Sequence, residues 1–177
     1  MDAKSSEKNK YVFSITRVST IVLLVISLIF VLRGSGICKY ASLASYSDHD
    51  CSTKTAYSFW EWKRYSSALY GQYAVVAFSS LTILLLTAVT SFRCCARSNR
   101  KMELSVLVLC ILLLIANIAM EAWFTSGKWA EFTATVKGYT MKVKPMFYIQ
   151  SWLIATILYF VELLIMLVDL YFVTKEQ

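Results

Sequence analysis

The sequence is poor in the residue types that build metal and redox sites. It has one histidine, His49, one proline and five glycines, and its cysteines form no Cys-x-x-Cys pair. Zinc sites take three or four ligands, and di-iron sites need clusters of histidine. His49 stands in the stretch Ser47-Asp48-His49-Asp50, which we interpret as a solvated turn. We therefore expect no metal, cofactor or redox centre.

Charged residues are also scarce, and motifs that bind phosphate are absent. Charged residues make up 16% of the chain, against about 25% in a typical soluble domain. No Gly-rich phosphate loop occurs. The net charge of +7 is basic, but the bases flank apolar segments, where anionic lipid headgroups explain them better than nucleic acid does. These absences indicate neither an enzyme nor a nucleic-acid-binding protein.

Long apolar segments are what the sequence does contain. Hydrophobic residues make up 58% of the chain. The hydrocarbon core of a bilayer, roughly 30 Å thick, takes about 20 helical residues to cross. We expect an all-α fold, a single antiparallel four-helix membrane bundle over residues 1–177. The expected spans are residues 14–32, 72–92, 103–124 and 148–173, with outer loops at 33–71 and 125–147 and a short linker at 93–102.

The density of basic residues predicts the orientation. Linker 93–102 is short and rich in arginine, which is a strong signal for cytoplasmic retention. We therefore expect both termini in the cytoplasm and both long loops outside. The first apolar run exceeds a signal-peptide core and no small-x-small cleavage site follows it, so we interpret it as a retained anchor. The tryptophans all fall on the expected outer side, which we interpret as an interfacial belt plus one packed loop: Trp60, Trp62, Trp123, Trp129 and Trp152.

The segment 55–70, just before the second span, has helical periodicity. Phe59, Trp62, Tyr65 and Leu69 fall on one face of a helix. This pattern favours either a short helix lying in the outer membrane interface or an early start to the second span.

The cysteines divide by compartment. Cys38 and Cys51 share the outer loop, where they either form a disulfide, worth roughly 3 kcal/mol in the chain-entropy description, or stay as thiols. Cys94 and Cys95 directly follow the second span beside arginines, a setting typical of S-palmitoylation; the alternative is two unmodified thiols. Cys110 lies in the middle of the third span, where packing is its expected role.

Polar residues repeat on one face of three spans. Facing lipid would be costly for them, so we expect these faces to point into the bundle. The faces are Ser80, Thr87 and Ser91; Glu103, Cys110, Asn117 and Glu121; and Ser151, Ala155, Glu162 and Asp169.

Antiparallel threading brings opposite charges to matching depths. Arg17 and Asp169 both lie about one turn from the cytoplasmic end, and Arg33 and Glu121 both lie near the outer end. Each couple could form an ion pair. For Arg17 and Asp169 the alternative is two independent interfacial charges, with the arginine reaching the headgroups.

Glu162 lies near the middle of the last span with no basic partner at its own depth. We expect it to be neutral, or hydrogen-bonded to Asn117 or to a hydroxyl, because loss of water favours the uncharged acid. It serves either as polar glue within the bundle or as part of a proton or ion pathway.

Two motifs carry a resemblance to a known group. The first span, ITRVSTIVLLVISLIFVL, has Arg17 near its start, and the aromatic stretch WKRYSSALYGQYAVV precedes the second. With the chain length and loop order, these resemble the four-span MARVEL group and, within it, the plant Casparian-strip-membrane-protein-like family. That family has an acid inside span three, whereas here Glu103 opens that span and Glu121 closes it.

The resemblance implies a plasma-membrane protein that self-associates into scaffolding platforms without catalysis. Its partners would be the lipid bilayer and further copies of the chain or other membrane proteins. The alternative function is an ion- or proton-conducting channel or transporter subunit that uses Glu162.

Overall fold

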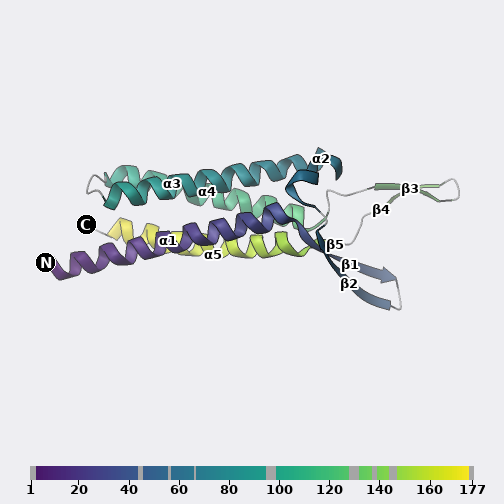
Figure 1. Ribbon diagram of the computed structural model, residues 1–177, viewed down its shortest axis with the longest axis horizontal. Helices are drawn as coiled ribbons and strands as arrows, with labels where there is room; N and C mark the ends of the chain where they lie inside the picture. The colour runs from purple at the N-terminus through teal and green to yellow at the C-terminus, as the bar shows by residue number, and fades with distance from the viewer. Residues whose placement is uncertain are drawn as a thin grey trace.

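Four long helices dominate the computed structural model: α1 (Ala3–Arg33), α3 (Tyr70–Cys94), α4 (Arg100–Thr125) and α5 (Gln150–Lys175). They lie alongside one another, with α1 starting and α5 ending at the same end (Figure 1). Helix α5 packs on α1 and α4, and α3 packs on the same two helices. The all-α four-helix bundle is thus confirmed. The structure describes residues 3–43, 46–55, 57–65, 67–94, 99–127, 132–136, 139–143 and 147–175.

All four helices are long and apolar enough to cross a membrane. The qualifying segments are Ile15–Arg33, Tyr70–Arg93, Arg100–Thr125 and Gln150–Lys175. Large apolar side chains point outward from these helices, as in Leu84, Ile15 and Leu112. The chain is therefore a multi-pass membrane protein, while the side on which its termini lie stays a prediction.

Buried positions repeat every three and then four residues in every long helix. In α5, for example, Trp152, Ala155, Tyr159, Glu162 and Met166 are all buried. This seven-residue repeat is the pattern by which nearly parallel or antiparallel helices interlock their side chains. Each helix thus presents one narrow face to the bundle axis and leaves the rest of its surface to lipid.

Glycine and asparagine shape two helix ends. Gly34, directly after α1, has φ +52°, and a Cβ there would overlap the carbonyl oxygen of Tyr57. Only glycine takes both that backbone and that contact without strain. At the start of α4, the side chain of Asn99 accepts a hydrogen bond from the Lys101 amide at 3.1 Å, a normal N-cap.

The end of the bundle opposite the start of α1 carries short strands (Figure 1). Strands β1 (Ser35–Leu43), β2 (Tyr46–Thr55) and β5 (Phe147–Ile149) form an antiparallel sheet in the order β2-β1-β5. Strands β3 (Phe132–Val136) and β4 (Tyr139–Val143) form a separate hairpin. The sequence analysis did not anticipate these strands.

The prediction that residues 47–50 form a turn is wrong. All four lie in β2, where His49 stands opposite Tyr40 of β1. Pairing with the neighbouring backbone holds the stretch extended, and local turn chemistry does not decide its shape.

The segment before α3 forms three short helical turns, η1 (Phe59–Glu61), α2 (Trp62–Tyr65) and η2 (Ser67–Leu69). Trp62 is fully buried and donates its indole N–H to the Tyr57 carbonyl at 2.8 Å. The helical periodicity is thus real, and Trp62 and Leu69 of this apolar face pack into the protein core.

The tryptophans do not behave as one belt. Trp62 and Trp152 are buried, whereas Trp60 and Trp123 are exposed. The Trp152 indole donates to the Val31 carbonyl at 3.0 Å and so joins α5 to the last turns of α1. Trp129 lies outside the described residues.

The strand register brings Cys38 and Cys51 directly opposite each other in β1 and β2, and disulfides need Cα atoms within about 7 Å. We predict that non-reducing peptide mapping recovers the two cysteines in one linked pair. Cys110, a buried thiol inside α4, serves as the internal control and should stay reduced. Recovery of Cys38 and Cys51 as two thiols would contradict the prediction.

Candidate functional site

Four charged side chains, one from each long helix, meet near the end of the bundle where α1 begins its span. They are Arg17 of α1, Arg93 of α3, Glu103 of α4 and Asp169 of α5, and we call them the charge cluster. Arg17 Nε donates to Asp169 Oδ2 at 2.8 Å, and Arg17 Nη2 reaches Asp169 Oδ1 at 3.4 Å. Arg17 Nη2 also contacts Glu103 Oε1, the atom to which Arg93 Nη1 donates at 2.6 Å.

Three of the four side chains of the charge cluster are buried, Arg93 is partly exposed, and the charges of the cluster balance. The side chains of Arg17, Asp169 and Glu103 are 2%, 3% and 6% exposed, and two cations face two anions. Each buried ion would cost several kcal/mol alone, and close opposite charges with good hydrogen-bond geometry offset that cost. The planar guanidinium suits this role because it donates to both carboxylates at once.

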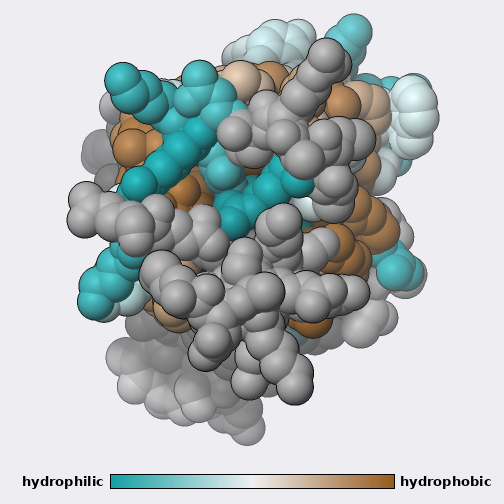
Figure 2. Space-filling model, turned by 90° about the vertical axis from the view of Figure 1, so that its left-hand side faces the viewer, coloured by the Kyte–Doolittle hydropathy of each residue, from teal (hydrophilic) through white to brown (hydrophobic). Residues whose placement is uncertain are grey.

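The structure brings Arg17 and Asp169 together, so the alternative of two independent interfacial charges does not describe it. Glu103 is the member that the sequence analysis placed only at the opening of the third span. Figure 2 shows this end of the molecule, where hydrophilic residues gather across the bundle and hydrophobic ones surround them.

The predicted pair of Arg33 and Glu121 does not form. Arg33 is exposed at the last position of α1, where its side chain reaches water. Glu121 is fully buried and accepts a hydrogen bond from Gln72 Nε2 at 3.3 Å. Sequence reasoning missed Gln72 because it treated that residue only as the boundary of the second span.

Further hydrogen bonds between helices follow along the interior. Ser27 Oγ donates to Glu162 Oε1 at 2.8 Å, so the partner of Glu162 is a hydroxyl of α1 and not Asn117. Asn117 Nδ2 donates to Ser79 Oγ at 3.0 Å. Ser79 and Tyr159 share a hydrogen bond of 2.7 Å. Ser27, Ser79 and Tyr159 had no place in the sequence analysis. For Tyr159 there was a usable signal, because it stands four residues after Ala155 and three before Glu162 on the predicted inner face.

The two parts of the interior are separated by an apolar layer. Leu24, Leu86, Leu107 and Met166, one from each helix, are buried and belong to one hydrophobic cluster. In each helix they stand between the charge cluster and the polar residues just described. We call those polar residues the polar column. Its members are Ser27, Gln72, Ser79, Asn117, Glu121, Tyr159 and Glu162.

Several oxygens of the polar column and of the residues beyond it lack a partner. Within the described part of the chain, the buried oxygens without a hydrogen bond are Gln72 Oε1, Asn117 Oδ1, Glu121 Oε1, Thr125 Oγ1, Ser151 Oγ and Glu162 Oε2. Each unsatisfied buried group costs about 1–3 kcal/mol. Ionisable residues inside a membrane usually mark a functional site for the same reason.

The expected inward faces are correct for two spans and wrong for one. The α4 face and the α5 face are entirely buried. In α3, however, Thr87 and Ser91 are exposed, and the buried polar residues are Gln72, Ser79 and Thr82. A shift by one residue turns a helix face by about 100°, so choosing Ser80 in place of Ser79 moved the predicted face away from the bundle interior. The Thr87 hydroxyl donates to the Ile83 carbonyl at 2.7 Å, which lets it face lipid at low cost.

The remaining predicted site residues are the cysteines, and the last question is whether a metal site is present. Cys94 is the last residue of α3, and Cys95 lies outside the described residues, so their S-palmitoylation stays a prediction. Cys110 is buried in α4. Within the described ranges, no three His, Cys, Asp or Glu side chains are grouped to hold a metal ion.

Comparison with known proteins identifies no relative of this chain. No protein-family model, curated protein or solved structure matches the chain.

The charge cluster predicts coupled effects of mutation. We expect Arg17→Met and Asp169→Leu each to lower thermal stability in detergent, because each leaves a buried charge without its main partner. The double variant should lose less than the sum, because Glu103 keeps its contact with Arg93. Polar couplings in membrane bundles average about 0.6 kcal/mol and reach about 1.7, and we expect the upper part of that range.

Arg33→Met is the control for this double-mutant cycle, because it removes an exposed arginine of the same helix. It should leave the melting temperature nearly unchanged. Strictly additive effects of the two cluster variants would show that Arg17 and Asp169 do not interact in solution.

Proposed function

We propose that this protein is a non-enzymatic scaffold of the plasma membrane that associates with further copies of itself. The observation that carries the proposal is the charge cluster, in which one side chain from every long helix joins a single network. Such a network favours one fixed arrangement of helices over sliding or rocking. A fixed body suits a structural platform better than a carrier that must alternate between two shapes.

The continuity of the four long helices also supports a scaffold. Transporters commonly bind their substrate where Gly or Pro breaks a helix within the membrane. Here Gly71, in the first turn of α3, is the one glycine inside the four long helices, and no proline lies in them. A Cβ at Gly71 would come within 2.6 Å of the Phe124 ring, so this glycine serves close packing of α3 on α4.

The outward face of α3 offers a surface for self-association. Thr87, Ala88 and Ser91 are exposed together on its half nearest the charge cluster. Helices in membranes associate through small and hydroxyl-bearing residues, because these let two backbones approach closely. We assign these three residues to the contact between copies.

Crosslinking in intact membranes tests this assignment. Ala88→Trp and Ser91→Trp should each reduce crosslinked oligomers several-fold, because a large side chain holds the facing helix away. Ser105→Trp, at an exposed serine of α4, is the matched control and should leave the oligomers unchanged. A wild-type protein that yields monomer alone would refute self-association.

Proton conduction is the second candidate, and the unpartnered oxygens of the polar column favour it. Glu162 and Glu121 each keep one buried carboxyl oxygen without a hydrogen bond. Between them stand the hydroxyls of Tyr159 and Ser79, groups that both donate and accept. A pathway would still have to cross the apolar layer to reach the charge cluster.

Proton flux into liposomes containing the purified protein distinguishes the two functions. A conductor should show flux that Glu162→Gln abolishes and that Tyr159→Phe reduces at least tenfold. Ser105→Ala, at the exposed serine of α4, is the control that should not alter it. Absence of any flux above protein-free liposomes would leave the scaffold as the function.

A further inference from the structure

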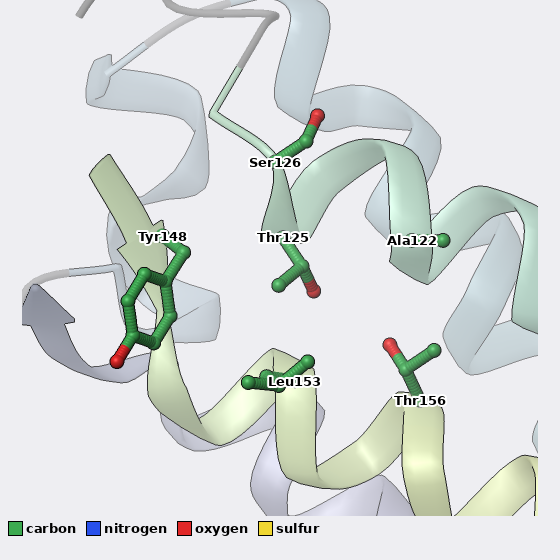
Figure 3. A pocket seen from close by; sticks show the side chains of 6 residues that line it. All are labelled: Ala122, Thr125, Ser126, Tyr148, Leu153 and Thr156. Atoms are coloured by element: carbon green, nitrogen blue, oxygen red, sulfur yellow. The ribbon is translucent and has the colours of Figure 1, made fainter. Parts of the chain in front are cut away.

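A cavity of about 380 Å³ opens between the end of α4 and the start of α5. Its size is within the range of small-molecule sites in proteins. The lining residues are Ala122, Thr125, Ser126, Tyr148, Leu153 and Thr156. In Figure 3, the Thr125 side chain of α4 and the Thr156 side chain of α5 point toward each other across the space, with Leu153 beside them.

The position of the cavity limits what can enter it. Thr125 is the last residue of α4, and Leu153 lies in the first turn of α5, so the cavity is at the level of the membrane interface. Ala122 and Leu153 are exposed on the outer surface of the bundle, which gives access from the bilayer. None of the six described lining residues is charged, so this wall offers no counter-ion to a phosphate or carboxylate headgroup.

Thr125 is unlike the other threonines of the spans. Its residue is 7% exposed, and its hydroxyl oxygen is buried without a hydrogen-bond partner. Other threonine hydroxyls donate to the carbonyl one turn earlier, a bond that costs a membrane helix little. The threonines that do so are Thr20, Thr82, Thr87, Thr90 and Thr156.

We propose that this cavity binds a neutral lipid whose headgroup is a single hydroxyl. An alcohol both donates and accepts one hydrogen bond. The Thr125 hydroxyl has its donor unused, and the Thr156 oxygen, whose proton goes to the Trp152 carbonyl at 2.8 Å, still has a lone pair to accept. The alcohol oxygen would accept from Thr125 and its proton would go to Thr156, which satisfies both threonines.

The surface deeper in the membrane suits the apolar body of such a lipid. Ala119 lies one turn below Ala122 on α4, and Ile157 lies one turn below Leu153 on α5; both are exposed. The two alanines leave room beside the isoleucine for a hydrocarbon body. A membrane alcohol keeps its hydroxyl at the interface and its body toward the bilayer centre, which matches this order of polar and apolar residues.

Photolabelling of the full-length protein in membranes tests the site. The probes are a photoreactive sterol, a photoreactive diacylglycerol and a photoreactive phosphatidylcholine. We expect one of the two alcohols, competed by its unlabelled form, to label peptides containing Ala122 or Leu153. Competed sterol labelling identifies a fused-ring alcohol, and competed diacylglycerol labelling identifies an acyl-chain alcohol.

Two variants separate binding from folding. Thr125→Val keeps the shape and removes the hydroxyl, so competed labelling should fall about three- to tenfold, the loss expected of one hydrogen bond. Ala122→Phe fills the cavity and should abolish it. Thr174→Val, at an exposed position of α5, and Ala77→Phe, at an exposed position of α3, are the matched controls and should label as wild type does. Phosphatidylcholine labelling equal to that of both alcohols, or labelling that no unlabelled alcohol competes, would overturn the proposal.

Discussion

The guanidinium of Arg17 is the group on which the arrangement of the helices most depends. It is buried, it contacts the carboxylates of α4 and α5, and through Glu103 it is linked to Arg93 of α3. In a membrane the apolar side chains of two helices gain little from each other that lipid does not also offer. A buried arginine cannot be satisfied by lipid, so it selects the one arrangement in which both acids reach it.

The polar column extends this selection along the rest of the bundle. Each of its contacts joins two helices: α1 to α5 through Ser27 and Glu162, α3 to α5 through Ser79 and Tyr159, and α3 to α4 through Gln72 and Glu121. Single contacts of this kind contribute little, about 0.6 kcal/mol on average. Together they fix the position of each helix along the bundle axis. They lie at successive depths, so sliding one helix by a turn would break several of them at once.

Much of the fold could be predicted because lipid imposes strong composition rules. Four apolar segments of sufficient length led directly to four helices, and the seven-residue spacing of Glu103, Cys110 and Asn117 identified the inner face of α4. In α3 the same reasoning failed. That helix offers two sets of small polar residues, Ser79 with Thr82 and Thr87 with Ser91, and a hydroxyl bonded to its own backbone suits lipid as well as protein.

The pairing of charges was harder to predict than their burial. Depth alone suggested Arg33 for Glu121, but depth does not say which side chain reaches the interior. Arg33, at the last residue of α1, can turn to water, whereas Gln72 is held on the inner face of α3. The strands were missed for a related reason. Their pairing joins residues distant in sequence, such as Ile37 of β1 and Ile149 of β5, and no local pattern records it.

Helix α5 shows how one sequence serves all of these demands. Its inner face carries, in order, Trp152, Tyr159, Glu162 and Asp169, with partners on α1 for three of them and on α3 for Tyr159. Ala155 and Met166 between these polar residues, and Val173 after the last of them, pack in the core at the same spacing. Polar residues thus occupy positions where apolar ones would pack equally well. Polar residues at these positions add little stability, but they fix which helices are neighbours and at what depth the helices meet. A bundle needs both to keep one shape in lipid.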